Sequence, residues 1–453
     1  YGVYDGKLID SYIEDPLSFI SGRGLSNESI LLATGYSSQI ENTMNLNVSA
    51  RYKFDDWVKG LSARVMYAYD HYYRRSAVRN KQIDTYSALK DTDGNTLLIK
   101  NKDEGGFSTF SESKSTYRVD YLEAAIEYDR TFNTHKVTAL LLYNQRQRRA
   151  PGLAYNVPQG LQGMVSRVTY AYDNKYLGEF NLGYNGSENF HKDRRFGTFP
   201  AFSLGWVLTE EKFFPKNTIL NWMKFRGSYG IVGNDQIGSS RFLYLPTAYA
   251  YGSNVYQLGT DGIDRENYSS ATEGKIGNPY ITWEKSKKMN IGADIHLLDS
   301  ELRFVFDYFT EKRNNILINR GTIPDIFGAT EVPPVNMGRI ENKGFEIEGI
   351  WTKKIRDFEF SIGGNISYAK NKVLFKDEPT AQYYWMMQTG FSVGQLKGYR
   401  TDGLYNYTSE VMNRPYYSFY ANKVQKGDIK YIDIDGDGII DQNDMVPMGF
   451  SSY

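Results

Sequence analysis

The chain has no cysteine among its 453 residues. Disulfide staples and thiolate metal sites are therefore excluded, which is compatible with an envelope protein but does not establish that location. Lys and Arg number 53, and so do Asp and Glu, so no net charge attracts nucleic acid. Electrostatics alone identifies no partner.

Long hydrophobic runs are also missing. No run approaches the roughly 18 apolar residues of a transmembrane helix, and the mean hydropathy is −0.53. A transmembrane β-barrel escapes this test because half of every strand is polar. Proline is scarce at 13 residues, whereas 38 Tyr, 25 Phe and 6 Trp are present. Such aromatic content suits membrane-interface girdles, but an aromatic-rich soluble β-protein, such as a carbohydrate-binding sandwich, fits the composition equally well.

Alternation along the chain favours the barrel. On one face of an extended strand over residues 45–54 lie Leu46, Val48, Ala50 and Tyr52, and on the other lie Asn47, Ser49 and Arg51. A strand of about ten residues with one apolar face and an aromatic end has the length and pattern that cross an outer membrane.

The same pattern recurs and predicts about a dozen strands. Beside 45–54, the candidates are residues 61–70, 122–129, 137–143, 167–172, 176–186, 199–209, 222–232, 287–297, 301–311, 342–352 and 357–369. Short turns such as 296–301 alternate with long polar and aromatic stretches such as 107–115 and 242–275. This asymmetry is typical of tight periplasmic turns and long outer loops. The expected fold class is all-β, a large antiparallel transmembrane β-barrel with long extracellular loops.

Several motifs follow one another in a characteristic order. They are Lys224-Phe225-Arg226-Gly227-Ser228-Tyr229-Gly230, Asn278-Pro279-Tyr280-Ile281-Thr282-Trp283, Asn290-Ile291-Gly292-Ala293-Asp294, Phe306-Asp307-Tyr308-Phe309, Asn336-Met337-Gly338-Arg339 and Gly398-Tyr399-Arg400-Thr401-Asp402-Gly403. The ordered set, over roughly residues 45–450, resembles the SusC/RagA-like family of TonB-dependent outer-membrane transporters of Bacteroidetes-type bacteria. One departure is Tyr184-Asn185-Gly186-Ser187, where the family usually has an Arg-Asp-Gly-Ser type sequence.

The resemblance implies a barrel of 22 strands, of which residues 1–453 are expected to form part. The plug, the N-terminal domain and the final strands are expected to lie outside this sequence. Residues 370–450 are expected to form a long outer loop region. The apolar face of 45–54 is then expected to contact lipid and its polar face a plugged lumen. The motif Asn342-Lys343-Gly344 resembles a strand entrance at which Gly relieves crowding.

By resemblance, the complete protein would import oligosaccharides or oligopeptides across the outer membrane. Its partners would be a SusD-like surface lipoprotein and, through the missing plug, the TonB complex. No enzyme activity is expected, because His71, His135, His191 and His296 form no recognisable metal pair or triad. The alternative is a soluble or surface-attached β-rich glycan-binding protein or glycoside hydrolase. A calcium-dependent adhesin would need tandem repeats, and we find none of fixed period.

The sharpest chemical motif lies at residues 433–444. Its expected metal ligands are Asp433, Asp435, Asp437, the backbone carbonyl of Ile439, Asp441 and Asp444. Carboxylates at positions 1, 3 and 5, with Gly438 at position 6, follow the spacing of a calcium loop. Hard oxygen ligands favour a structural calcium ion over magnesium. The competing interpretation is an acidic solvated loop, because Asp444 is shorter than the usual Glu at position 12.

Aromatic loop segments are candidates for contact with sugar rings or peptide side chains. The two richest stretches are residues 383–387 and 244–256. Packing within the loops, or against a partner protein, is the competing interpretation for both.

Overall fold

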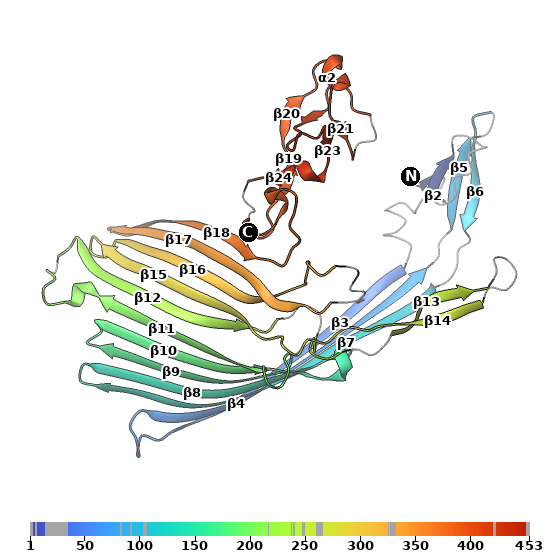
Figure 1. Cartoon of the computed structure of the whole chain (residues 1–453). Coiled ribbons are helices and arrows are strands. Elements are labelled where there is room, and N and C mark those ends of the chain that lie inside the picture. Colours follow the sequence, from blue (N-terminus) through green and yellow to red (C-terminus); the bar gives the residue numbers. More distant parts are fainter. Residues whose placement is uncertain are drawn as a thin grey trace. The chain divides into compact units, whose positions relative to one another are not determined.

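The computed structural model of the chain consists mainly of β-strands (Figure 1). It describes residues 3–4, 7–13, 35–81, 84–90, 93–102, 107–215, 217–236, 238, 241–246, 250–259, 266–324, 326, 332–419 and 423–449. Two compact units divide the chain. The first comprises Tyr1–Ser49, Met66–Leu122 and Arg146–Gln159, and the second comprises Ala50–Val65, Glu123–Gln145 and Gly160–Tyr453. Within the described ranges, every helix is too short or too polar to span a bilayer.

Twelve strands form one sheet whose spatial order follows their order in the sequence. They are β3 (Gly35–Lys53), β4 (Leu61–Lys81), β7 (Phe107–Phe132), β8 (His135–Arg149), β9 (Gln159–Tyr172), β10 (Tyr176–Ser187), β11 (Phe196–Val207), β12 (Leu220–Asn234), β15 (Glu284–Leu297), β16 (Leu302–Ile318), β17 (Val335–Ile355) and β18 (Phe358–Phe375). Each overlaps one of the strand segments predicted from alternation, and residues 208–209, predicted as strand, lie in a 3-10 helix instead. The expectation of about a dozen long strands is therefore confirmed.

Short turns and long connections alternate along this sheet. At one end the connections are residues 54–60, 133–134, 173–175, 208–219, 298–301 and 356–357, and all but 208–219 have seven residues or fewer. At the other end they are residues 82–106, 150–158, 188–195, 235–283 and 319–334, and none has fewer than eight. Along a meander, this alternation places all short turns at one end of the strands. That arrangement matches the asymmetry predicted from the sequence.

Two stretches predicted to be loops contain strands instead. Residues 107–115 belong to β7, which is 26 residues long, and residues 242–275 include the hairpin of β13 (Ala250–Leu258) and β14 (Glu266–Thr272). Ladder hydrogen bonds hold such extensions without an apolar face. The loss of alternation therefore marks where an apolar face ends, and the strand itself continues past that point.

The register of the second unit separates an apolar face from a polar face. One cross-strand row contains Tyr170, Gly178, Leu204, Gly227, Ile291, Tyr308, Phe345 and Tyr368. The next row towards the short turns contains Tyr172, Tyr176, Trp206, Phe225, Ala293, Phe306, Ile347 and Ile366. Their large side chains are mostly exposed to solvent, although they are apolar or aromatic. A sheet that exposes such rows without a covering layer is built to face lipid.

The polar face of β3 follows the prediction at Arg51. Arg51 forms an ion pair of 2.8 Å with Glu127, and Arg64 on β4 forms one of 2.6 Å with Glu123. By contrast, Tyr52 is 64% exposed. The charged groups that pair across strands therefore lie on one face, and the aromatic rings lie on the other.

Smaller elements lie outside the twelve-stranded sheet. In the first unit β1 (Val3–Tyr4), β2 (Lys7–Ile13), β5 (Thr85–Lys90) and β6 (Thr96–Lys102) form a four-stranded sheet. Single-turn 3-10 helices occur at Ala154–Asn156, Leu208–Glu210, Tyr384–Met386 and Gln442–Asp444.

The residues after β18 form a small folded module. It contains β19 (Lys397–Tyr399) paired with β24 (Met445–Pro447), β20 (Thr401–Leu404) with β22 (Ile429–Tyr431), β21 (Tyr416–Tyr417) with β23 (Ile439–Ile440), and the helix α2 (Thr408–Met412). Tyr405, Tyr417, Val424 and Ile440 are buried together as its core. The region expected to be a long outer loop, 370–450, thus starts inside β18 and has a hydrophobic core of its own.

Candidate functional site: the polar face and the acidic loop

A charged network centred on Arg226 lies on the polar face of the sheet. The two Nη atoms of Arg226, on β12, donate to the two carboxylate oxygens of Asp307 on β16 at 2.7 and 2.6 Å. Its Nε donates to Asp294 on β15 at 3.1 Å. A Cβ added at Gly292 would lie 2.7 Å from Arg226 Cζ, so glycine makes room for the guanidinium. Motif residues from three strands therefore meet in one bidentate ion-pair network.

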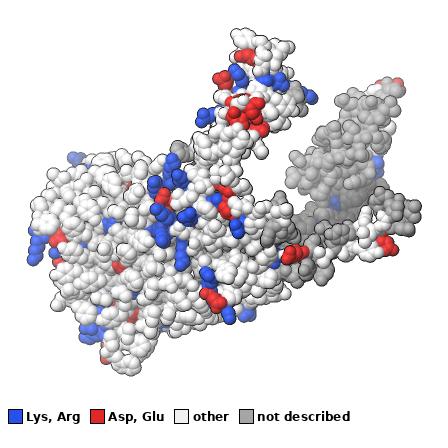
Figure 2. Space-filling view, viewed as in Figure 1, with Lys and Arg blue, Asp and Glu red and all other residues white. Residues whose placement is uncertain are grey.

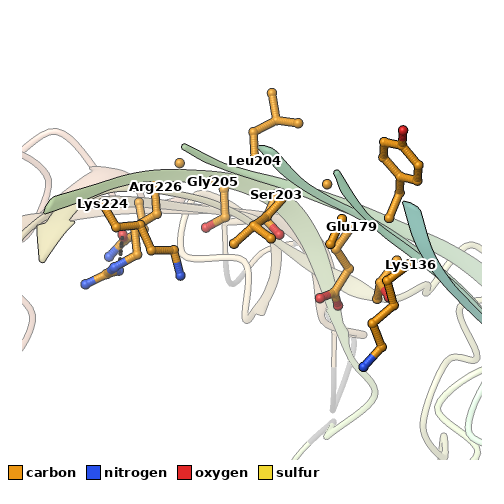
Figure 3. A pocket seen from close by; sticks show the side chains of 15 residues that line it. Lys136, Glu179, Ser203, Leu204, Gly205, Lys224 and Arg226 are labelled. Atoms are coloured by element: carbon orange, nitrogen blue, oxygen red, sulfur yellow. Dashed lines mark hydrogen bonds between the residues drawn. The ribbon is translucent and has the colours of Figure 1, made fainter. Parts of the chain in front are cut away.

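A cleft of about 330 Å³ lies beside this network. Figure 3 shows Lys136, Glu179, Lys224 and Arg226 on one side of the sheet and Leu204 on the opposite side. Charged side chains line the cleft, so it suits water or a polar chain segment and excludes lipid. Sequence reasoning placed polar residues on this face but did not identify the network, because pairing across strands depends on register.

The segment Asn278–Trp283 is tied to the start of β17 by side-chain amides. Asn336 accepts from the Thr282 N–H at 2.8 Å and donates to the Thr282 carbonyl at 2.9 Å and the Asn315 carbonyl at 2.8 Å. Asn278 donates to the Pro334 carbonyl at 3.0 Å. These contacts give the two motifs an architectural role.

Trp283 completes a second buried cluster. Phe190, Phe199, Leu243, Ile281 and Trp283 pack together, and Trp283 Nε1 donates to the Arg195 carbonyl at 3.0 Å. The cluster joins the long connections around β10, β11 and β15 and anchors them to the strands.

The unusual Tyr184-Asn185-Gly186-Ser187 segment is accommodated without a charge. Tyr184 stacks on Phe196 with ring centroids 5.0 Å apart. Ser187 is buried and its Oγ donates to Asp235 at 2.7 Å. A hydroxyl and a stacked ring therefore hold this end of β10.

Each of the four histidines contacts one or more residues of neighbouring strands or turns. His71 is 3.3 Å from Thr116, His135 is 2.8 Å from Tyr170, and His191 is 3.2 Å from Asp193. His296 packs against Trp222 with ring centroids 4.7 Å apart. Their contacts are those of strand and turn residues.

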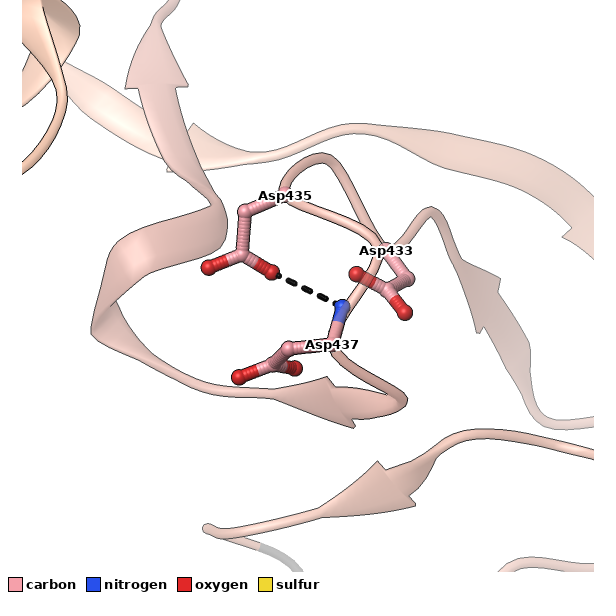
Figure 4. Close-up of side chains that lie close together, drawn as sticks. All are labelled: Asp433, Asp435 and Asp437. Carbon is pink, nitrogen blue, oxygen red and sulfur yellow. Dashed lines mark hydrogen bonds between the residues drawn. The ribbon is translucent and has the colours of Figure 1, made fainter.

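The acidic loop brings three of its predicted ligands together. Carboxylate oxygens of Asp433, Asp435 and Asp437 lie within 4.8 Å of one another (Figure 4). Asp433 accepts from the N–H groups of Gly436 and Gly438 at 2.7 and 2.8 Å. Figure 2 shows the resulting dense group of acidic side chains on the module.

The other predicted ligands have different surroundings. Ile439 lies in β23 opposite Tyr416, and Asp441 accepts from Asn443 N–H at 2.7 Å at the start of the 3-10 helix. Asp444 is fully buried and accepts from the N–H groups of Ile434 and Asp441 at 2.6 and 2.9 Å. The Asp444 carboxylate thus links the backbone at the start of the loop to the backbone near its end.

The pKa of one loop carboxylate, Asp435, is raised. Burial raises the pKa of Asp435, and the neighbouring Asp437 carboxylate raises it further. Burial and the negative charge of Asp437 both disfavour the ionised form of Asp435. A bound cation would offset the repulsion between the two carboxylates.

The aromatic stretch 383–387 packs partly against this loop. Trp385 Nε1 donates to the Asn443 carbonyl at 2.7 Å and stacks on Tyr383 with centroids 4.6 Å apart. Tyr384 remains 73% exposed. No sequence signal linked Trp385 to the acidic loop, because 58 residues separate it from Asn443. In the stretch 244–256, the His191 ring contacts Tyr244, and residues 247–249 lie outside the described ranges.

A long-stranded meander with one aromatic, solvent-exposed face and one charged face defines the wall of an outer-membrane β-barrel. The chain belongs to the family described as TonB dependent receptor-like, beta-barrel, whose model matches residues 4–438. It is an outer-membrane protein.

The curated relatives are longer proteins. TonB-dependent receptor P3 of Formosa agariphila is 26% identical over 426 residues, which are 85% of this chain and 39% of that protein. TonB-dependent receptor SusC of Bacteroides thetaiotaomicron is 32% identical over 222 residues, 49% of this chain and 21% of that protein. The chain thus spans well under half of either relative.

Solved structures agree on the fold. The RagAB peptide importer in the closed-closed state has a TM-score of 0.65 at 16% identity, covering 93% of this chain and 46% of that one. The open-open state gives the same TM-score over 92% of this chain and 44% of that one.

Proposed function

We propose that the protein containing this chain imports oligosaccharides or oligopeptides across the outer membrane, driven by TonB. The observation that carries the proposal is family membership over residues 4–438, together with a sheet that has one lipid-type and one charged face. The charged face, with the Arg226 network and its cleft, would form the lumen wall through which a polar solute passes. This chain forms part of that wall, and the energy coupling belongs to the rest of the protein.

A SusD-like surface lipoprotein is the proposed partner at the outer face. Support comes from the long connections at one end of the strands and from the folded module after β18, which offers exposed Tyr407 and Met412. Relatives named SusC and RagAB make the same partnership a reasonable expectation for the whole protein.

Uptake experiments test the import proposal. A strain lacking the gene should lose growth on one class in a panel of oligosaccharides and oligopeptides as sole nutrient, and the same loss should follow deletion of TonB. The intact gene, but not one carrying Arg226→Ala with Asp307→Ala, should restore growth to wild-type rate. Normal growth of the deletion strain on the whole panel would refute the proposal.

We also propose that the acidic loop binds a structural calcium ion, with magnesium the weaker alternative. Asp433, Asp435 and Asp437 would supply the first ligands, and the ion would stiffen the module around Ile440. In the intact protein, calcium should raise the melting temperature of the module, and Asp433→Ala with Asp435→Ala should abolish the increase. The control Asp402→Asn removes an exposed charge of the same module outside the loop and should leave the response intact. No calcium response in the wild type would remove the site.

A further inference from the structure

Five lysines gather on the lipid-type face of four adjacent strands. We call them the basic patch, and they are Lys287 of β15, Lys312 of β16, Lys343 of β17, and Lys370 and Lys372 of β18. All five are exposed.

The patch occupies two neighbouring rows of the sheet. Lys343 lies opposite Lys370 in one row, and the next outward-facing row contains Lys287, Lys312 and Lys372. In this second row Glu341 lies between Lys312 and Lys372, and its carboxylate is 3.3 Å from the Lys312 ammonium group. It is the single carboxylate in these two rows of the four strands, so positive charge predominates.

The patch begins where the apolar band ends. On β18 the apolar face runs from Phe358 to Tyr368, and Lys370 is the next residue on that face. This run rises roughly 33 Å along the strand, which is roughly 25 Å along the membrane normal at a tilt of about 40°. That height equals the apolar band of an outer-membrane barrel. The ammonium groups therefore lie at the headgroup level.

The patch lies at the outer boundary of the membrane. It is on the side of the long connections, which face the cell exterior in outer-membrane barrels. At the opposite boundary, Lys353 of β17 is neutralised by Glu301, with its Nζ 2.7 Å from each carboxylate oxygen. The excess of lysine over carboxylate on this face of β15–β18 thus belongs to the outer boundary.

Towards β12 the patch ends. The same face of β9–β12 contains every second residue of the ranges 164–172, 176–184, 198–206 and 223–229, counted from the first residue of each. None of these residues is charged. If lysines served only to anchor a barrel at the interface, those strands would need them equally. Tyr368 and Phe345, whose ring centroids are 5.9 Å apart, form an aromatic floor below the lysines.

We propose that the basic patch binds the phosphate groups of the glycolipid that forms the outer leaflet of the outer membrane. Phosphorylated sugars of that lipid lie at this height, their acyl chains would cover the Phe345–Tyr368 floor, and lysine ammonium groups bind phosphate as point charges. The Lys312–Glu341 pair and four further lysine charges would surround one headgroup site on these adjacent strands. The proposal depends on outer-membrane location and is independent of what the protein imports.

Lipid binding by the full-length protein tests this. Purified protein in detergent is titrated with bisphosphorylated lipid A, with the same lipid after enzymatic dephosphorylation, and with phosphatidylglycerol. The wild type should bind the phosphorylated lipid A about tenfold or more tightly than either other lipid, since each basic residue adds to attraction by anionic lipid. A variant with all five lysines changed should lose that preference; its substitutions are Lys287→Gln, Lys312→Gln, Lys343→Gln, Lys370→Gln and Lys372→Gln.

The matched control changes five exposed lysines of turns and loops, as Lys59→Gln, Lys192→Gln, Lys212→Gln, Lys423→Gln and Lys426→Gln. It removes the same charge and should keep the preference. Three results would overturn the proposal: equal binding of phosphorylated and dephosphorylated lipid A, equally tight binding of phosphatidylglycerol, or unchanged preference in the patch variant. Retained heat-modifiable migration on gels checks that each variant is folded.

Discussion

Gly344 is fixed by the close approach of β17 to its neighbours. A Cβ at this position would overlap the Tyr368 carbonyl oxygen and would lie 2.8 Å from the Phe309 ring. The sequence motif Asn342-Lys343-Gly344 predicts relief of crowding at a strand entrance. The crowding is confirmed, but the entrance is wrong, because Gly344 lies in the middle of β17. The backbone cannot move away easily, because Gly344 pairs with Phe309 on one side and Ala369 on the other.

Gly344→Ala should therefore destabilise the intact protein by about 1–3 kcal/mol, the usual range for overpacking a tight site. Thermal unfolding followed by circular dichroism in detergent measures the change. The control is Gly364→Ala in the adjacent strand, where a Cβ would meet nothing within 4 Å. Equal melting temperatures for the two variants would contradict the crowding explanation.

The strands illustrate what alternation can and cannot predict. Their existence and faces were predictable, since a period of two places Phe345 and Ile347 opposite in direction to Glu346 and Glu348. The outer ends of the strands were not predictable. Polar extensions such as residues 107–115 are paired in the sheet, but their sequence does not alternate between apolar and polar residues. The Arg226 network depends on a register shared by three strands, and no spacing within one strand encodes it.

The helix α2 depends on a charged cap that should respond to pH. Glu410 accepts from the N–H groups of Asn406 and Tyr407 at 2.9 and 3.1 Å, and these bonds hold its pKa below the usual value. A lowered folded-state pKa means that the stabilisation is present above about pH 4.3 and is lost as pH falls through the folded pKa.

Glu410→Gln should therefore increase hydrogen exchange at residues 406–412 about twofold or more at pH 7, because the capping bonds lose their charge. The difference from wild type should vanish only when the pH is well below the lowered pKa of Glu410, where both side chains are neutral. Exchange followed by mass spectrometry, corrected for intrinsic rates, measures this in the intact protein. The exposed Glu273→Gln is the control and should change nothing; a difference that persists at low pH would rule out the carboxylate as its cause.

Across the molecule, the family assignment and the register together decide which side of the sheet faces lipid. Residues 45–54 have one apolar and one polar face, and the ion pair between Arg51 and Glu127 places the charge of this segment on the polar side. Alternation does not predict the module after β18. The sequence predicts a long loop there, whereas the structure has a folded module with Tyr405 and Ile440 in its buried core. Short strands of two to four residues carry too little periodic signal to be recognised.

Adjacent residues in the middle of β18 give the most direct test of the two faces. Ile362 is 68% exposed on the apolar face, opposite Trp351, and Ser361 points to the polar face. Ile362→Arg near the centre of the apolar band should destabilise the folded barrel by about 2–4 kcal/mol, because lipid cannot solvate the guanidinium. Ser361→Arg adds the same group one residue away and should fold normally, since water and acidic partners reach the polar face. Urea-induced unfolding in lipid vesicles compares the two variants, and a larger loss for Ser361→Arg would reverse the assignment of the faces and, with it, the position of the basic patch.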